Sequence, residues 1–176
     1  DVVHATPLYE TLYRSVPEKR ILLKLADCYE QRGYYDQAVK LIMSQTGALE
    51  YPDLKLLEEC YRQTDDEKNM FLCRKKICDL NIYDFKNVVD LAEGFLKEDR
   101  PDSAMVYIDR YCRVDSGNIL VNREKAKILY QKKDYREAIS QYGRLVAEGD
   151  RSLGTHFYLA MAYLQLDSLQ QSYKYM

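Results

Sequence analysis

The sequence predicts an all-α fold, a solenoid built from antiparallel helix pairs. The first observation behind this prediction is a set of small residues that recur 34 residues apart, namely Ala92, Ala126 and Ala160. The second is that three further series of residues have the same spacing of 34. They are Ala104, Ala138 and Ser172; Phe95, Leu129 and Tyr163; and Ile108, Tyr142 and Met176. Several series in phase over successive units indicate stacked repeats of one supersecondary unit.

The range 84–114 shows most clearly why each unit is expected to be a pair of helices. Its first half carries apolar residues at i, i+3, i+4 and i+7, which form one helical face, and they are Val88, Leu91, Ala92 and Phe95. A second stripe follows at Ala104, Ile108 and Tyr111. Between the stripes, we expect Asp99 to cap the second helix and Pro101 to start it, because the first helical position tolerates a missing N–H.

Three further ranges carry the same two stripes, and these are 18–48, 52–81 and 118–149. In the first of them, Gly33 is the expected turn. The range 52–81 departs furthest from the pattern, since Glu58 stands where other units have a small residue. Thr64, with Glu67 three residues later, is the expected cap of its second helix.

The chain is expected to form one solenoid domain over 1–176, with incomplete repeats at 1–17 and 152–176. Stacked repeats normally end in caps with a polar outer face. The last helix instead carries Leu169 and Tyr173 on a face that would need a covering neighbour. We therefore expect the chain to be a segment of a longer array, or its ends to be covered by end-to-end self-association through the cut repeats.

Composition excludes several classes of protein. The formal net charge of −2 lacks the basic excess of a general nucleic-acid binder, so no nucleic-acid partner is expected. No apolar run approaches the roughly 18 residues of a membrane span, so no membrane insertion is expected. The five cysteines are spread singly and do not resemble a disulfide framework. They favour a reducing compartment such as the cytoplasm, while a secreted or periplasmic location stays open.

The repeated phrases resemble the tetratricopeptide repeat (TPR) family, and the likeness covers nearly the whole chain. The residues that carry it on the first helices are Leu22, Leu25, Ala26 and Tyr29; Leu91, Ala92 and Phe95; Ala126 and Leu129; and Leu159, Ala160 and Tyr163. On the second helices they are Ala38 and Ile42, Ala104 and Ile108, Ala138 and Tyr142, and Ser172. The resemblance implies a right-handed α-solenoid, a TPR-like superhelix, whose concave face binds proteins or peptides.

No constellation of catalytic residues is evident. The two histidines, His4 and His156, lack neighbours at metal-ligand spacing. The glycine-spaced segment 149–154 is followed by Thr155 and His156 rather than by Lys and Ser or Thr, so it is interpreted as a turn and not a phosphate loop. The sequence therefore predicts a protein that is not an enzyme, with no catalytic residues, no metal site and no cofactor.

The resemblance places the inner face on the first helices. Its early part is mixed in charge, with Arg20, Leu23, Asp27, Lys55 and Glu59, and acidic residues there would repel an acidic chaperone tail. The candidate groove lies further along, and its nine residues are Lys86, Val89, Glu93, Arg123, Lys127, Tyr130, Phe157, Tyr158 and Met161. Arg123 and Lys127 would form a cationic edge beside an aromatic floor, suited to a peptide with an acidic group next to a hydrophobic anchor. Alternatively, a further repeat covers these aromatic residues.

The leading functional hypothesis is a non-catalytic scaffold that binds a protein or peptide of unknown identity. It predicts that charge reversal at Arg123 and Lys127 abolishes partner capture without lowering the melting temperature. The alternative is a ligand-sensing or peptide-sensing accessory segment of a larger regulator or enzyme. A helical-repeat RNA binder is a third reading, which the acidic residues of the inner face disfavour.

Overall fold

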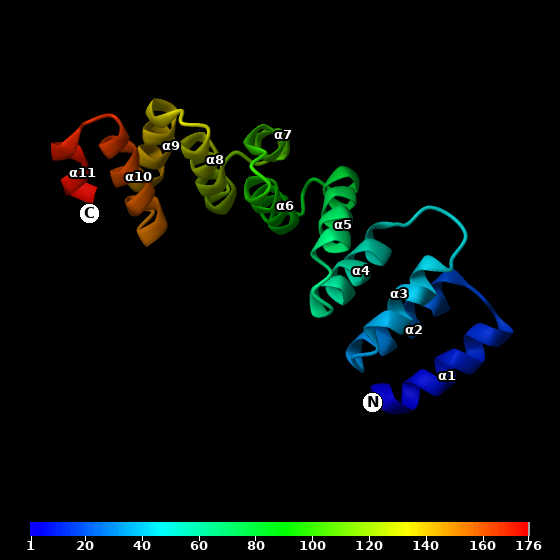
Figure 1. Cartoon of the computed structure of the whole chain (residues 1–176). Coiled ribbons are helices and arrows are strands. Elements are labelled where there is room, and N and C mark those ends of the chain that lie inside the picture. Colours follow the sequence, from blue (N-terminus) through cyan, green and yellow to red (C-terminus); the bar gives the residue numbers. More distant parts are fainter. Residues whose placement is uncertain (176) are drawn as a thin grey trace. The chain divides into compact units, whose positions relative to one another are not determined.

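The computed structural model describes residues 1–175, and over that range it contains eleven α-helices and no strand (Figure 1). Met176, which ends one of the predicted series, lies outside the described residues. The chain divides into two compact units, unit 1 from Asp1 to Asn81 and unit 2 from Ile82 onward. That residues 1–176 form a single domain stays a prediction.

Unit 1 is a stack of five helices, which are α1 (Val2–Ser15), α2 (Lys19–Gln31), α3 (Tyr35–Met43), α4 (Tyr51–Gln63) and α5 (Glu67–Leu80). Each helix packs against the next along the chain, and α2 also packs against α4. The first helices of two successive pairs therefore lie side by side. The stripes predicted from the sequence form the core, with Leu22, Ala26, Ala38, Ile42, Leu54, Leu57 and Ile77 buried together.

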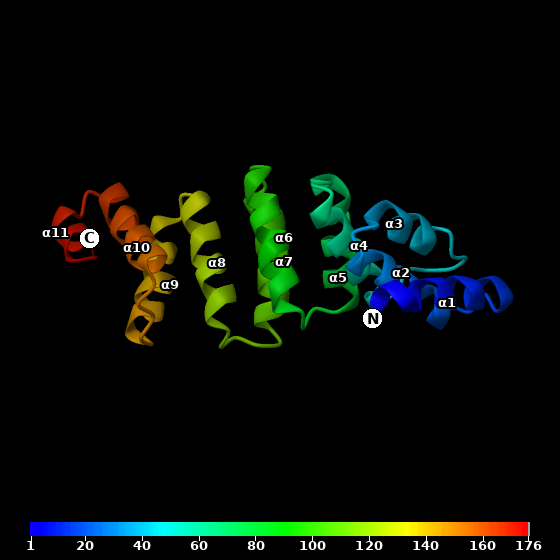
Figure 2. The same ribbon diagram turned by 90° about the horizontal axis from the view of Figure 1, so that it is seen from below.

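Unit 2 contains six helices within its described residues. They are α6 (Phe85–Lys97), α7 (Pro101–Cys112), α8 (Ile119–Gln131), α9 (Tyr135–Ala147), α10 (Leu153–Gln165) and α11 (Leu169–Tyr175). The first helices again pack on one another, and α8 lies between α6 and α10 (Figure 2). Ala126, Leu129, Ala138, Tyr142, Leu145 and Leu159 form one buried cluster, so each of the four series spaced by 34 residues contributes a member to this core.

One turn recurs between the two helices of every pair. Its central residue has a positive φ each time, and these residues are Gly33, Asp65, Asp99, Lys133 and Asp167. The residue after it donates its backbone N–H five positions back, as Tyr34 does to the Tyr29 carbonyl over 2.8 Å and Asp134 to the Leu129 carbonyl over 3.0 Å. This is a Schellman C-cap, which ends the first helix and starts the return of the chain. The backbone therefore repeats even where the side chains do not.

Two capping predictions are wrong, and both errors come from this turn. Asp99 has φ 54° and is the left-handed residue of the turn, while Arg100 stands at the N-cap of α7 and Pro101 is its first residue. Thr64 ends α4, and the cap of α5 is Asp66, whose side chain accepts from the Asn69 backbone N–H. Polar residues occupy the whole turn, so several of them look like N-cap residues. Composition alone therefore places the N-cap one or two positions too early.

Glu58 accounts for the departure of the range 52–81 from the repeat pattern. It occupies the small-residue position of α4, is 1% exposed, and bonds to three cations: Arg74 of α5 at 3.0 Å, Arg62 at 3.0 Å and Lys55 at 3.1 Å. Burial raises the pKa of its carboxyl, but the hydrogen bonds from Arg74 and Lys55 prevail and leave the pKa below its usual value. An ion-pair network thus joins α4 to α5 where other pairs use close contact at an alanine.

Candidate functional site

The nine residues predicted as a groove lie on the three first helices of unit 2, and they divide between two hollows. Lys86, Val89, Glu93 and Arg123 line a hollow of about 280 Å³ between α6 and α8. Phe157 and Met161 line another, of about 350 Å³, with Leu153 and Tyr175. Lys127, Tyr130 and Tyr158 line neither of these two hollows.

Arg123 is held by a buried carboxylate. Its Nε donates to Oδ2 of Asp150 over 2.7 Å and its Nη2 donates to Oδ1 over 2.5 Å. Asp150 is 5% exposed, and it also accepts from the Thr155 hydroxyl and the Ser152 backbone N–H. The hydrogen bonds from Arg123 hold the pKa of Asp150 well below its usual range. The guanidinium thus neutralises a buried charge from the turn between α9 and α10.

Lys127 is also engaged within unit 2. Its Nζ lies 3.3 Å from a carboxylate oxygen of Glu93 and 3.3 Å from one of Glu124. Burial raises the pKa of Glu124, and the charge of Lys127 partly offsets that effect. With Arg123 on Asp150 and Lys127 on two glutamates, the predicted cationic edge carries little free positive charge for an acidic ligand.

The predicted aromatic floor is a packed cluster. Tyr158 lies between two tyrosines, with its ring 5.4 Å from that of Tyr130 and stacked 6.0 Å from that of Tyr142. Phe157 meets Tyr158 edge-on at 5.4 Å yet keeps 58% of its surface exposed. Tyr130 and Tyr158 therefore serve the contact between α8, α9 and α10, whereas Phe157 remains available to a ligand.

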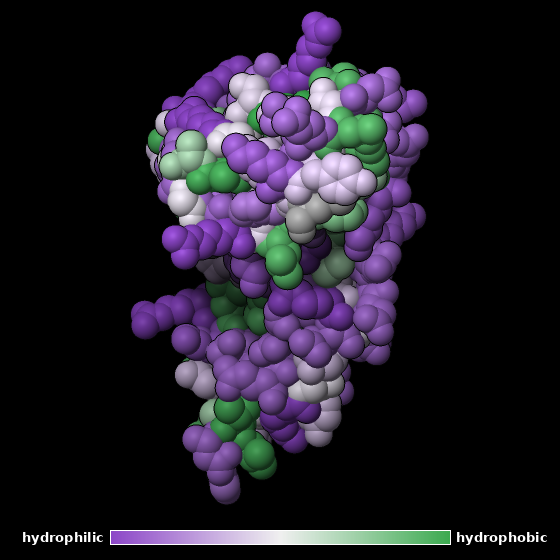
Figure 3. Space-filling view, turned by 90° about the vertical axis from the view of Figure 1, so that its left-hand side faces the viewer, coloured by the Kyte–Doolittle hydropathy of each residue, from purple (hydrophilic) through white to green (hydrophobic). Residues whose placement is uncertain are grey.

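Several large apolar side chains of α10 and α11 are exposed. Leu153 is 89% exposed, Leu169 58% and Tyr173 74%. Figure 3, viewed from the side on which α10 and α11 lie in Figure 1, shows green hydrophobic residues scattered among the purple hydrophilic ones. Such residues stay accessible to another molecule.

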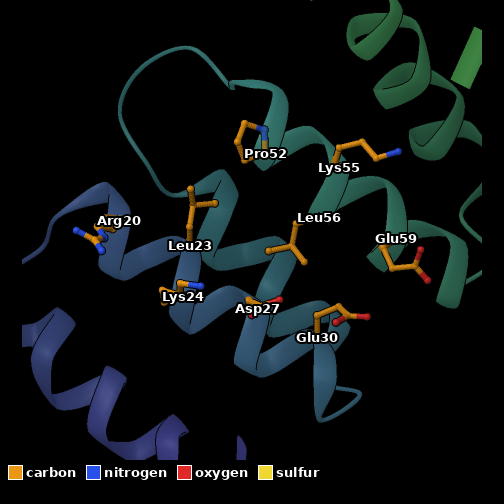
Figure 4. A pocket seen from close by; sticks show the side chains of 9 residues that line it. All are labelled: Arg20, Leu23, Lys24, Asp27, Glu30, Pro52, Lys55, Leu56 and Glu59. Carbon is orange, nitrogen blue, oxygen red and sulfur yellow. The ribbon is translucent and has the colours of Figure 1, made fainter. Parts of the chain in front are cut away.

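A larger groove lies in unit 1, between α2 and α4, and it has a volume of about 530 Å³. Its lining combines apolar and charged residues, and they are Arg20, Leu23, Lys24, Asp27 and Glu30 from α2 with Pro52, Lys55, Leu56 and Glu59 from α4. Figure 4 shows Leu23, Leu56 and Pro52 in the middle, Arg20 at one end, and Glu30 with Glu59 at the other. This groove has the size and the mixed lining of a ligand site.

The charges of this groove differ in whether they are already neutralised. Lys55 bonds to Glu58 at 3.1 Å, and Glu59 bonds to Arg62 at 2.5 Å. Arg20, Lys24, Asp27 and Glu30 form no ion pair within residues 1–175. Burial raises the pKa of Glu30, and the charges of Glu59 and Asp27 raise it further, so Glu30 lies among carboxylates of which only Glu59 is paired with a cation.

The sequence predicts five of these residues on the inner face but does not single them out as a site. It missed Lys24, Glu30, Pro52 and Leu56. The helical period offered a signal, since Arg20, Lys24, Asp27 and Glu30 follow one another at steps of three and four along α2. What the period does not show is which charges are paired inside the fold.

Two further features bear on the kind of site this is. In the part of the chain that the structure describes, no group of three His, Cys, Asp or Glu side chains is arranged to hold a metal ion. Among the helices of residues 1–175, none combines the length and the apolar character that crossing a membrane requires.

Comparison with known proteins gives similarity in structure and not in sequence. No protein-family model matches the chain, and no curated protein matches it at a significant level. Among solved structures, YrrB, a TPR protein with an unusual peptide-binding site, superposes with a TM-score of 0.75 and 10% identity over 95% of this chain and 88% of its own.

Two other neighbours are TPR proteins of named organisms. The C-terminal part of one from Cytophaga hutchinsonii gives a TM-score of 0.72 at 16% identity, over 99% of this chain and 71% of that one. A second, from Parabacteroides merdae, gives 0.68 at 13% identity over the same shares. At such identities the likeness concerns the fold alone. The recurring helix pairs and these neighbours together show that the chain has the all-α helical-repeat solenoid fold of tetratricopeptide repeat proteins.

Proposed function

We propose that this chain is a non-catalytic scaffold that binds a peptide segment of another protein, and that the groove between α2 and α4 is its binding site. The observation that carries the proposal is the groove itself, about 530 Å³ in volume, with an apolar middle and four charges that have no partner in the fold. Apolar burial would supply the affinity, and the charges would fix position.

The likeness to YrrB supports this proposal, because that protein is described by its peptide-binding site. The site predicted on unit 2 stays a prediction. Its two cations are engaged with carboxylates, so Phe157 and Met161 are its members best suited to contact a partner. The accessory role in a larger regulator or enzyme remains the alternative, and it would use the same groove for a signalling peptide.

A peptide-display selection on the immobilised chain tests the proposal. We expect enriched peptides to bind the wild type and to lose at least tenfold in affinity for Leu23→Asp, which places a charge in the apolar middle of the groove. Leu72→Asp is the matched control, because Leu72 is 47% exposed on α5 and outside the groove. Peptides that bind all three proteins equally, or a selection that enriches none, would overturn the proposal.

A further inference from the structure

The unpaired charges of the α2–α4 groove are segregated by sign. Arg20 and Lys24 occupy the first half of α2, and Asp27 and Glu30 occupy the second half. None of the four forms an ion pair with another described residue. The two charges contributed by α4 are neutralised, Lys55 by Glu58 and Glu59 by Arg62. The groove therefore presents a positive end and a negative end to solvent.

The distance between these ends sets the length of a ligand. Arg20 and Glu30 are ten positions apart on α2, which is about 15 Å along a helix at roughly 1.5 Å per residue. An extended peptide advances about 3.3 Å per residue. A segment of about five residues thus spans the groove from one charged end to the other.

The middle of the groove is apolar. Leu23 and Leu56 face one another across it, and Pro52 borders them, between the charged ends (Figure 4). Leu23 and Leu56 are only half-buried, so an aliphatic side chain placed over them would be removed from water together with them. Proline adds a rigid apolar wall that has no backbone N–H to leave unsatisfied.

A cationic side chain of the ligand would be stabilised at the negative end of the groove. Glu30 is partly buried, and both Asp27 and Glu59 lie near enough to raise the pKa of its carboxyl beyond what burial does. A lysine or arginine side chain arriving there would relieve the repulsion between these carboxylates. At the other end, a carboxylate would find Arg20 and Lys24, neither of which forms an ion pair with another described residue.

We propose that the groove binds an extended segment of about five residues with an aliphatic side chain at its centre and opposite charges at its ends. The acidic end lies over Arg20 and Lys24, and the basic end lies over Asp27 and Glu30. This inference rests on the proposed function, since it names the chemistry of the peptide that the same groove would take.

Four capped pentapeptides test the inference. All share a central alanine-leucine-alanine, and their ends are glutamate and lysine, lysine and glutamate, two glutamates or two lysines. Each is titrated into the isotopically labelled chain, and binding is followed by the backbone amide shifts of α2 and α4. We expect the oppositely charged peptides to bind about tenfold more tightly than either like-charged one, because a like-charged peptide loses an attractive contact at one end and gains a repulsive contact there.

Three controls make the result specific. The preference should disappear at about 0.5 M salt, where exposed charges are screened over a few ångströms. In Asp27→Asn/Glu30→Gln, the peptide with two glutamates should bind as tightly as the oppositely charged ones, because the repulsive end has become neutral. Leu72→Asp should leave the preference unchanged.

The outcomes separate this inference from the proposed function. If the affinities of all four peptides for the wild type lie within twofold of one another, the groove binds peptides without discriminating between their charges. Only this inference then fails. If none of them shifts the amides of α2 and α4 at millimolar concentration, both the inference and the proposed site fail.

Discussion

Arg123 shows how the partner of one residue decides its role. Its position on α8 suggests a ligand contact, yet two of its nitrogens bond to Asp150, a carboxylate that is 5% exposed. We expect Arg123→Glu to lower the free energy of unfolding by about 3–5 kcal/mol, because it leaves a buried carboxylate opposed by another. Chemical denaturation measures the loss, and Arg151→Glu, at an exposed neighbour, should change stability by less than about 0.5 kcal/mol.

This expectation revises the one drawn from the sequence, in which charge reversal at Arg123 and Lys127 would leave the melting temperature unchanged. If such a variant fails to capture a partner, unfolding of the variant would explain the result as well as the loss of a binding contact would. If Arg123→Glu proves as stable as the wild type, the contact with Asp150 does not stabilise unit 2.

Lys133 tests the recurring turn at the level of one backbone angle. It is exposed and has φ 62°, whereas Gly33 has the same place in the first complete pair. We expect Lys133→Gly to raise the free energy of unfolding by about 1 kcal/mol, and Gly33→Ala to lower it by a similar amount. A Cβ at Gly33 would meet nothing within 4 Å, so the second change tests backbone conformation alone. Thermal melts in which both variants shift in the same direction would contradict this account.

At the scale of the helix pair, Glu58 joins α4 to α5 and makes the stability of unit 1 depend on pH. Its pKa is lower in the fold than the usual 4.5, so its contribution is complete above that value and is lost as the pH falls below it. We expect Glu58→Gln to cost about 3 kcal/mol at pH 7, and less near pH 3. The adjacent Glu59→Gln should cost under about 1 kcal/mol at either pH, because its pair with Arg62 is partly exposed.

Urea denaturation of unit 1 between pH 3 and pH 7 follows this difference. A constant gap between the wild type and Glu58→Gln over that range would mean that ionised Glu58 gives no net stability to the α4–α5 pair.

The sequence predicts the helix pairs well because their stripes are local and repeat in phase. Ala92, Ala126 and Ala160 are buried on first helices, where the spacing placed them. What the sequence conceals depends on contacts across longer distances: Glu58 meets Arg74 sixteen residues later, and Arg123 meets Asp150 twenty-seven residues later. The site predicted on unit 2 relied on the charges of Arg123 and Lys127. Only a charge that is not already paired inside the fold is available to a ligand.

At the scale of the whole molecule, the exposed apolar residues of α10 and α11 lead us to expect self-association, which is one of the two arrangements predicted from the sequence. Leu153 is 89% exposed and Phe157 58%. We expect sedimentation to show a mass that rises with concentration for the wild type, and a constant mass for Leu153→Ser/Phe157→Ser, which removes apolar area from that face. Val106→Ser, at a residue that is 64% exposed on α7, should behave as the wild type. A wild type that stays monomeric at millimolar concentration would exclude this association.

For the protein as a whole, we propose that it acts by holding a peptide in the groove between α2 and α4. The most direct measurement is of intermolecular nuclear Overhauser effects between a peptide enriched by selection and the methyl groups of the labelled chain. We predict contacts from the peptide to the methyl groups of Leu23 and Leu56, which form the middle of the groove. Contacts confined to methyl groups elsewhere, such as those of Leu153 and Met161 on α10, would contradict the claim and place the site in unit 2.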